Sequence, residues 1–176
     1  MELGFYLRPN GHRQATQWLV IVDEFTRENL CLEVGYNFTS NDIIDELAKL
    51  SATRGLPQFI RSDNGPELIA EKLRGWLENL DVGALYIAPG SPWENAYAES
   101  FNSRFRDEFL ALEVFDNLQA ARKLTGFWRA NYNEHRPHSS LDYMTPADFA
   151  RQVFCFSRLR SFSKTLPEGR RKQSKL

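Results

Sequence analysis

The first third of the chain shows the residue pattern of short β-strands. Residues 17–24 and 29–34 are runs rich in β-branched and apolar side chains, and residues 1–7 form a similar run before them. Such runs, bounded by polar residues, are typical of strands. Only the four residues 25–28 separate the second run from the third, so these two strands are predicted to form a hairpin.

Farther along, helical and strand-like spacings alternate. From Asn41, apolar side chains recur every three or four residues up to Gly55 and Pro57, which predicts a helix that ends there. The same reasoning predicts strands at 58–61 and 84–87 and helices at 67–79, about 93–112 and about 118–133. This order favours an α/β fold, with a mixed sheet of about five strands and helices on both faces. From Phe156 onward the periodicity disappears, and no regular structure is expected.

Charge is distributed unevenly along the chain. Residues 151–176 hold eight of the 22 Lys/Arg residues and one of the 23 Asp/Glu residues, so this segment carries +7 (8 minus 1) and residues 1–150 carry −8 (14 minus 22). A basic segment favours a nucleic-acid partner because it neutralises phosphates. A solubilising terminus explains the same composition. We therefore divide the chain into a core at 1–150 and a basic, flexible tail at 151–176.

The composition also bears on cellular context. No apolar run reaches the roughly 20 residues that span a bilayer, and the N-terminus lacks the pattern of a secretory signal. We therefore expect a cytoplasmic protein without a membrane partner. Cys31 and Cys155 form no metal-ligand pattern, so both are expected to be reduced, buried thiols.

Two acidic residues stand at positions that suit chemistry. Asp63 follows the strand predicted at 58–61 and precedes an Asn-Gly-Pro turn, which places its side chain at the carboxyl end of the strand, where α/β sheets bind ligands. An Asx turn that only joins strand to helix explains the same residues. The helix predicted from Trp93 has an apolar stripe formed by Tyr97, Phe101, Phe105 and Phe109. Its opposite, polar side is formed by Glu99, Asn102, Ser103 and Arg106.

Four motifs connect these residues to a known family. Asp63 lies in IRSDNGPEL (60–68) and Glu99 in PGSPWENAYAESFNSRFRDEFL (89–110), while VDEFTREN occupies 22–29 and a YNxxRPHSSL segment occupies 132–141. In this order and spacing the motifs resemble those of the DDE transposases and retroviral-type integrases. The likeness is greatest to the transposase encoded by the second reading frame of two-frame bacterial insertion sequences. It extends over about residues 18–149.

The resemblance implies a ribonuclease-H-like fold and a bacterial protein that cleaves and joins DNA during transposition or integration. It also implies binding to element ends and target DNA as a homo-oligomer, and three acidic residues that hold two Mg²⁺ or Mn²⁺ ions. Asp63 and Glu99 match two of the three. Hard cations prefer carboxylate oxygens, and two ions about 4 Å apart can activate a nucleophile and stabilise the leaving oxygen.

Further residues are candidates for DNA contact. By resemblance, Arg106 matches a basic position near DNA, and Asn102 and Ser103 share its helix face with Glu99. Arg106 as a surface partner for Asn102, Asp107 or Glu108 is the alternative. Arg136 is assigned a structural role or a DNA-backbone contact. The nearby His135 and His138 have a spacing that suits zinc, but no cysteine lies near them and Pro137 breaks regular structure.

The first catalytic Asp of the family is missing. Counting back without gaps from Phe25 places the family's Asp-Phe pair on Gly4-Phe5, and glycine cannot ligate a metal. Three explanations stay open: inactivation by an Asp-to-Gly change, a truncation or frame change at the N-terminus that also removes an upstream DNA-recognition region, or a substitute ligand. Candidate substitutes are Glu2, on the same strand face as Gly4 by alternation, and Asp23 at the end of the next strand.

These observations favour the catalytic core of a DNA-strand transferase, and Gly4 places the activity of this copy in doubt. A ribonuclease-H-like nuclease that hydrolyses without joining is an alternative that the DNGPE and YAESFN motifs disfavour. A non-catalytic DNA-binding or assembly remnant of a transposase is a second alternative, and Gly4 favours it.

Overall fold

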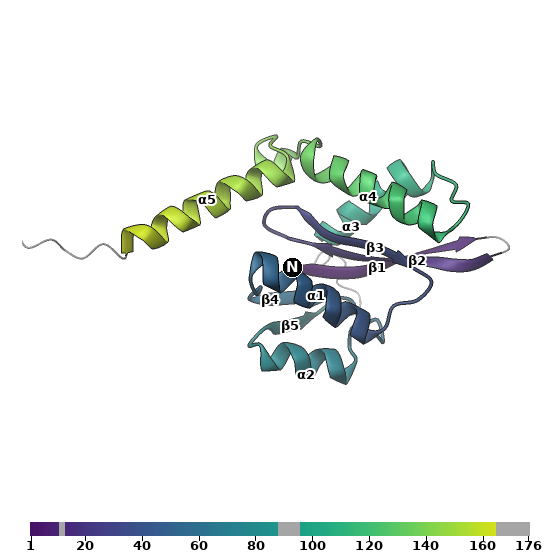
Figure 1. The fold of residues 1–176 in the computed structure, drawn as a ribbon, viewed down its shortest axis with the longest axis horizontal. Helices are drawn as coiled ribbons and strands as arrows, with labels where there is room; N and C mark the ends of the chain where they lie inside the picture. Colours follow the sequence, from purple (N-terminus) through teal and green to yellow (C-terminus); the bar gives the residue numbers. More distant parts are fainter. Residues whose placement is uncertain (11–12, 88–95, 165–176) are drawn as a thin grey trace, which may run out of the picture.

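Five strands form one sheet in the order β3-β2-β1-β4-β5. In the computed structural model the backbone is described for residues 1–10, 13–87 and 96–164, and side chains are described for these ranges apart from 5–10, 13–14, 96–98 and 156–164. The elements, shown in Figure 1, are β1 (Glu2–Asn10), β2 (Arg13–Val22), β3 (Asn29–Gly35), α1 (Ser40–Arg54), β4 (Phe59–Ser62), α2 (Glu71–Asn79), β5 (Gly83–Tyr86), α3 (Ala96–Phe105), the π-helical η2 (Arg106–Leu110), α4 (Leu118–Glu134), the 3-10 helix η3 (Ser139–Leu141) and α5 (Pro146–Lys164).

The sheet is mixed, as the sequence predicts. β1 pairs antiparallel with β2, and β2 pairs antiparallel with β3. β4 runs parallel to both β1 and β5. The predicted hairpin between the second and third strands is therefore confirmed, and the first predicted strand is the central strand of the sheet.

Helices cover both faces, because side chains alternate along the strands. On one face, Leu19 and Ile21 of β2 belong to a buried cluster with apolar residues of α1 and α2. On the other face, Trp18 and Val20 belong to a cluster with residues of α3, η2 and α4. The predicted stripe on α3 and η2 is confirmed for Phe101, Phe105 and Phe109, which are all buried.

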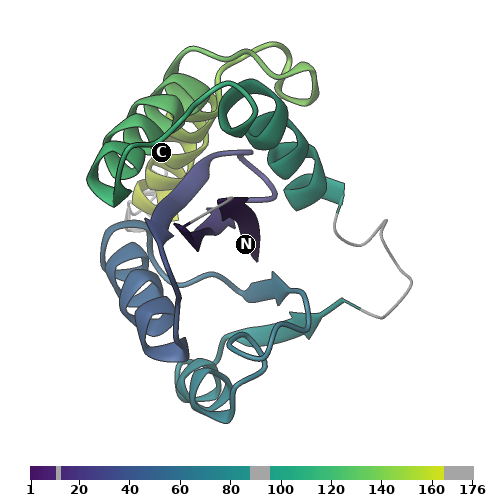
Figure 2. The same cartoon turned by 90° about the vertical axis from the view of Figure 1, so that its right-hand side faces the viewer.

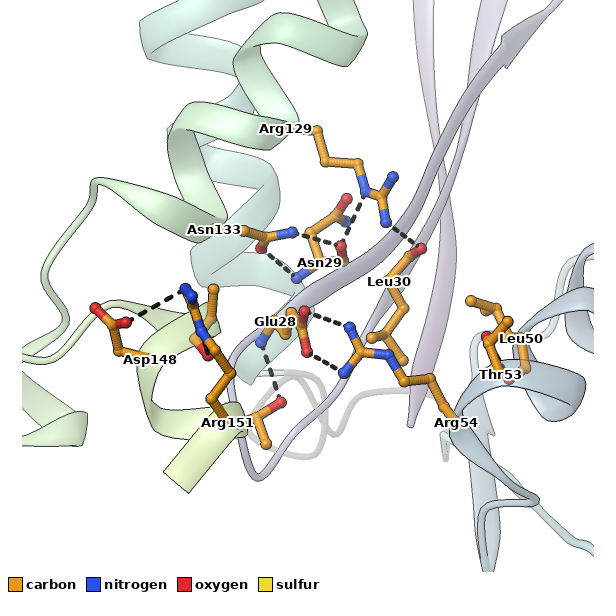
Figure 3. A network of polar contacts seen from close by, with 12 residues as sticks. Glu28, Asn29, Leu30, Leu50, Thr53, Arg54, Arg129, Asn133, Asp148 and Arg151 are labelled. Carbon is orange, nitrogen blue, oxygen red and sulfur yellow. Dashed lines mark hydrogen bonds and ion pairs between the residues drawn. The ribbon is translucent and has the colours of Figure 1, made fainter. Parts of the chain in front are cut away.

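Side chains of α4 satisfy the open edge of the sheet. β3 is an edge strand, and an unpaired strand edge invites pairing with another chain. The Asn133 amide accepts from the backbone N–H of Asn29 and donates to its carbonyl, both at 2.9 Å, and Arg129 donates to the carbonyls of Asn29 and Leu30 (Figure 3). Beside them, Arg54 makes two hydrogen bonds to the buried Glu28 and ties α1 to the start of β3.

Replacing Asn133 with Ala should destabilise the fold by about 1–3 kcal/mol, because it leaves the buried Asn29 N–H without its acceptor. Urea denaturation followed by circular dichroism would measure the loss. Asn131→Ala is the matched control, since Asn131 lies on the same helix and is exposed. Equal effects of the two changes would contradict the role of Asn133 at the edge.

Some element boundaries and one helix differ from expectation. β2 ends at Val22 instead of residue 24, because Asp23 Oδ1 accepts from the N–H groups of Phe25 and Thr26 and starts the turn. The helix expected from Glu67 begins at Glu71, because the N–H groups of Leu68 and Ile69 bond back to the Gly65 carbonyl in a turn. The start expected at Trp93 for the next helix lies outside the described residues.

The expectation of no regular structure from Phe156 onward is wrong for residues 156–164. Thr145 caps α5 through its hydroxyl and the N–H of Asp148, with Pro146 as the first helical residue, and the helix continues to Lys164. Its second half extends away from the sheet in Figure 1. Cys155 on α5 is exposed, so only Cys31 is a buried thiol as expected. None of the helices in the described part of the chain is long and apolar enough to cross a membrane.

Candidate active site

The strand register places position 4 next to Asp63. In the parallel pair of β1 and β4, Leu3 is level with Ser62. The next residue on each strand is Gly4 and Asp63. Counting back from Phe25 without gaps assigned the family's first catalytic Asp to Gly4. The register places this position beside Asp63, one of the two acidic residues that match the family's motifs.

Gly4 and Asp63 also share a face of the sheet. Gly4 pairs directly with Val20, whose side chain lies in the cluster under α3 and α4. Leu3 and Ile60 face the opposite cluster, so alternation turns Gly4 and Asp63 toward the α3 side. A Cβ atom at Gly4 would meet no atom of the described residues within 4 Å. The backbone there has room for a larger side chain.

Asp63 is held by the turn that follows β4. Its Oδ1 accepts from the Gly65 N–H at 2.9 Å, which is the Asx turn considered as the structural alternative. Asn64 Nδ2 donates to the Ile87 carbonyl at 3.0 Å and ties the turn to the end of β5. The side chain of Asp63 is exposed, and its other carboxylate oxygen accepts no hydrogen bond from the described residues. The turn therefore orients the carboxylate through one oxygen and leaves the other oxygen without a hydrogen bond from the described residues.

Glu99 lies in the first turn of α3 and is exposed. The helix is anchored by Phe101 and Phe105, which are 1% and 0% exposed, and it lies against β1. In Figure 2 the start of α3 lies on the side of the molecule toward which the arrowheads of β4 and β5 point. The fold thus brings Glu99, Gly4 and Asp63 to one side of the sheet from three elements.

The polar residues that follow Glu99 on α3 and η2 differ in their partners. Arg106 Nε donates to Asp107 Oδ1 at 2.9 Å, and Arg106 Nη2 donates to Ser103 Oγ at 3.3 Å. Asp107 is one of the surface partners that the alternative interpretation named. Asn102 is half-buried, and its buried Oδ1 has no hydrogen-bond partner among the described residues. Arg106 begins the π-helical segment η2, a type of distortion that is frequent at functional sites.

The two candidate substitutes for the missing Asp lie at different places. Asp23 follows Val22, which pairs with Glu2, so Asp23 is level with Met1, about 10 Å along the strand from Gly4. Its Oδ1 closes the β2–β3 turn, and it lines a pocket of about 420 Å³ whose described lining includes neither Asp63 nor Glu99. Glu2 shares the face of Gly4 and is 1% exposed. Position therefore argues against Asp23, whereas Glu2 is on the correct face but two residues away.

The segment after α4 carries Arg136 and the two histidines. Arg136 forms a bidentate ion pair with Glu108. His135 is exposed, whereas His138 is buried and its ring packs edge-on against Tyr132 of α4 at 5.1 Å. Burial raises the pKa of Tyr132 to about 12 despite the opposing effects of Arg104, Arg136 and Arg27, of which that of Arg104 is the largest.

Sequence reasoning missed two basic residues of this region. Arg27 and Arg104 act electrostatically on both Tyr132 and His138. Both arginines lie inside motifs already singled out, VDEFTREN and the segment around Glu99. Their place in these motifs was the available signal, but their electrostatic effect on Tyr132 and His138 depends on how the hairpin, α3 and α4 pack.

The carboxylates of the site fit a divalent metal only in part. Asp63 and Glu99 supply the oxygen ligands that Mg²⁺ and Mn²⁺ prefer. Within residues that the structure describes, no group of three or more His, Cys, Asp or Glu side chains is arranged to hold a metal ion. Position 4, beside Asp63, holds a glycine and supplies no carboxylate.

Comparison with known sequences identifies the family. Two family profiles match residues 4–92 and 80–146, and both are described as integrase core domain. An uncharacterized 39.2 kDa protein of insertion element IS476 from Xanthomonas euvesicatoria is 39% identical over 150 residues, and an uncharacterized 31.7 kDa protein of insertion element IS407 from Burkholderia multivorans is 39% identical over 141 residues. These alignments cover 85% and 80% of this chain but 43% and 50% of the relatives, so the chain spans about half of their length. The transposase of insertion sequence element IS904 from Lactococcus lactis is 23% identical over 145 residues, which are 78% of this chain and 56% of that protein.

Solved structures agree on the fold. The catalytic core domain of the integrase of HTLV-2, solved in complex with magnesium in a trimeric form, has a TM-score of 0.62 at 13% identity and covers 84% of this chain and 94% of that one. The core domain of BIV integrase has a TM-score of 0.63 at 16% identity, over 92% and 97% of the two chains. At these identities the likeness establishes the ribonuclease-H-like fold alone. Together with the profile that matches residues 4–92, it leads to one conclusion: the chain belongs to the integrase core domain family and is related to the transposases of bacterial insertion sequences.

Proposed function

We propose that this chain is the catalytic core portion of an insertion-sequence transposase and that it acts on the DNA of its element, with a metal site that is incomplete in this copy. The strand register carries the proposal, because it sets position 4 beside Asp63 on the α3 side of the sheet. The names of the bacterial relatives support an origin in an insertion sequence. Residues 1–150 are proposed as the core, and residues 151–176 as a basic extension that contributes DNA affinity.

In this proposal Asp63 and Glu99 are the residues that hold Mg²⁺ or Mn²⁺. When bound, two such ions supply activation of the attacking oxygen and stabilisation of the leaving oxygen. The chain itself contributes orientation: the Gly65 N–H fixes Asp63, and the buried phenylalanines of α3 fix the helix that carries Glu99. In the metal-bound protein, we expect the two carboxyl groups to lie within about 10 Å of each other, since ions about 4 Å apart must share them.

Gly4 determines how far the chemistry proceeds. Without a carboxylate at position 4, one ion lacks a ligand, and the residues that the structure describes hold no group of three or more His, Cys, Asp or Glu that could take its place. We therefore propose that strand transfer by this chain is weak. The same observation favours a second function, that of a DNA-binding or assembly remnant without catalysis, which keeps the fold and its surfaces but not the complete metal site.

DNA and further copies of the chain are the proposed partners. Asn102 and Ser103 lie on α3 with Glu99, Arg106 follows at the start of η2, and Arg136 lies on the segment after α4, so these residues are proposed to contact the DNA backbone. Arg106 would exchange its exposed pair with Asp107 for a phosphate, at little cost because an exposed ion pair contributes about 1 kcal/mol or less. The trimeric form of the HTLV-2 core supports a proposed homo-oligomer.

Replacing Arg170, Arg171, Lys172 and Lys175 with Gln should weaken binding to a duplex oligonucleotide and flatten its salt dependence. Each lost phosphate contact removes roughly 0.9 from the slope of log affinity against log salt, so four lost contacts would remove up to about 3.6. Fluorescence anisotropy over a range of NaCl concentrations measures the slope.

A matched control is available for net charge. Lys49, Lys72, Arg74 and Lys123 are exposed on α1, α2 and α4, and replacing them with Gln removes the same four charges. The proposal for the extension expects a smaller slope change in this control. Equal slopes for both variants would show that only total charge matters, and an unaltered slope in the first variant would remove the extension from the DNA-binding surface.

A further inference from the structure

A groove of about 420 Å³ lies where the β2–β3 turn, the end of α1, the strands β4 and β5, and α5 meet. Five large apolar side chains of its lining are exposed. Their exposed fractions are 64% for Phe25, 51% for Leu56, 52% for Phe59, 41% for Leu85 and 43% for Phe154. Exposed apolar side chains that gather in one place mark an interaction site, because burying them on a partner is favourable.

The topology of the sheet explains why this apolar surface is exposed. Alternation along β4 turns Ile60 toward α1 and α2 and turns Phe59 and Arg61 the other way. Leu85 of β5 is level with Arg61 in the parallel pair, so it shares their face. On that face, α3, η2 and α4 pack over β2 and β3. The part of the face formed by β4 and β5 therefore keeps apolar side chains exposed.

Contacts between distant elements hold the groove in shape. Arg54 of α1 donates to Glu28 at 2.6 and 2.8 Å (Figure 3), and its guanidinium lies 5.7 Å from the centre of the Phe154 ring on α5. On the other side, Arg61 Nε donates to Glu24 Oε1 at 3.2 Å. A surface that is already ordered loses little conformational freedom when a partner binds.

The charged side chains of the lining have an acidic excess. They are three carboxylates and two guanidinium groups, which sum to −1 (2 minus 3), from Asp23, Glu24, Glu28, Arg54 and Arg61. Both guanidinium groups are already paired with glutamates of the groove. A DNA backbone would meet these carboxylates, so charge disfavours nucleic acid here. It favours a protein segment that combines apolar with basic side chains.

The second half of α5 has this composition. Residues 156–164 have the sequence FSRLRSFSK, in which three residues are apolar (Phe156, Leu159 and Phe162) and three are basic (Arg158, Arg160 and Lys164). The helix continues through them away from the sheet (Figure 1). A continuous helix does not turn back on itself, so this segment can reach the groove of a second copy but not its own.

We propose that two copies of this chain pair with two-fold symmetry and that each inserts residues 156–164 of α5 into the groove of the other. Docking of a helix into an apolar groove is a common mode of recognition. The two-fold axis makes the contact occur twice. This pairing rests on the homo-oligomer of the proposed function and identifies its surface. The four basic residues proposed for DNA contact lie beyond residue 164 and are not part of it.

Sedimentation equilibrium without DNA tests the pairing and should show a dimer that dissociates on dilution. Leu56→Lys should raise the dissociation constant at least about tenfold, or ~1.4 kcal/mol, because the changed groove occurs twice in each dimer. Leu159→Lys should cause a similar loss from the helix side. Leu112→Lys is the matched control, since Leu112 is 74% exposed and lies outside the described lining. A monomer at every concentration, or a dimer that neither variant weakens, would overturn the pairing.

Cross-linking tests the geometry. If residue 160 of each copy lies beside Phe154 of the other, the axis passes near residue 157 and the two Cys155 Cα atoms lie on the order of 10 Å apart. Cys155 is exposed and Cys31 is buried, so a short bismaleimide should link the dimer through Cys155, and Cys155→Ser should abolish the link. A dimer that is not linked would overturn this arrangement.

Binding of a duplex oligonucleotide, measured separately by fluorescence anisotropy, distinguishes this pairing from the proposed action on DNA. A cross-linked dimer that does not bind the duplex would keep the pairing and contradict the action on DNA. A monomer that binds the duplex would overturn the pairing and leave the action on DNA in place.

Discussion

Replacing Gly4 with Asp is expected to tighten Mn²⁺ binding by about tenfold or more, which is at least ~1.4 kcal/mol. The new carboxylate would lie beside Asp63 on the α3 side of the sheet, because Leu3 is level with Ser62 and Gly4 pairs with Val20. The site has open space at the Cβ position, so the change should not strain β1. A third carboxylate supplies the hard oxygen ligand that the cation prefers.

Isothermal titration calorimetry measures this gain in affinity, and thermal unfolding gives a second readout. Without metal, two carboxylates side by side repel each other, so the variant should unfold at a lower temperature than the parent at pH 7. Mn²⁺ should raise the unfolding temperature more in the variant than in the parent, since a ligand that binds the folded state stabilises it. Gly4→Asn is the matched control, because it adds a side chain of the same shape without the charge.

Cleavage of a pre-nicked DNA end reports on the chemistry. Gly4→Asp should show more cleavage than the parent, and Asp63→Asn should abolish it in both backgrounds. Asp63-dependent cleavage by the unmodified chain that matches the variant would contradict the proposal of an incomplete site and would direct attention to Glu2. If Mn²⁺ binding tightens but no cleavage appears, the metal site is repaired and the requirement lies in parts of the relatives that this chain does not span.

Replacing Phe105 with Ala should destabilise the protein by about 3–5 kcal/mol, the largest loss that we expect from a single core residue. Phe105 is 0% exposed, and its ring contacts Trp18 on the sheet, Phe101 and Phe109 on its own helix, and Trp128 on α4. Truncation leaves a cavity where the sheet, α3 and α4 meet. A domain is stable by about 5–15 kcal/mol in all, so the loss is a large fraction of the total.

Urea denaturation measures this loss, with Phe127→Ala as the control. Phe127 is on α4 and is 63% exposed, so its truncation should change stability by about 0.5 kcal/mol or less. If Phe105→Ala proves unable to fold, Phe105→Leu fills most of the cavity and should show a smaller loss in the same direction. A loss at Phe105 no greater than at Phe127 would mean that α3 is not anchored through this stripe, and the placement of Glu99 would then need another explanation.

Much of the candidate site follows from local patterns. The strand-turn sequence around Asp63 predicted an exposed carboxylate at the end of a strand, and the structure shows that strand and an Asx turn. The four-residue repeat of phenylalanines predicted which side of α3 is buried, and so which side carries Glu99. These predictions succeed because side-chain periodicity and turn chemistry act within a few neighbouring residues.

Other expectations failed where long-range contacts dominate. The helix continues through residues 156–164 from a well-capped start, so its backbone hydrogen bonds extend past the point where regular structure was expected to end. Asp23 is a reasonable substitute ligand by its sequence position, yet the antiparallel register of β1 and β2 carries it level with Met1, about 10 Å along the strand from Gly4. Cys155 was expected to be a buried thiol, but it is exposed on α5.

The sequence by itself determined the strand and helix order, the family motifs, and the absence of a carboxylate at position 4. Only the tertiary structure decided that Gly4 lies beside Asp63 with room for a side chain, and that α4 closes the open edge of β3. The reason is physical: periodicity decides what one element buries, whereas the meeting of side chains from separate elements depends on strand register and helix packing, which many distant contacts set together.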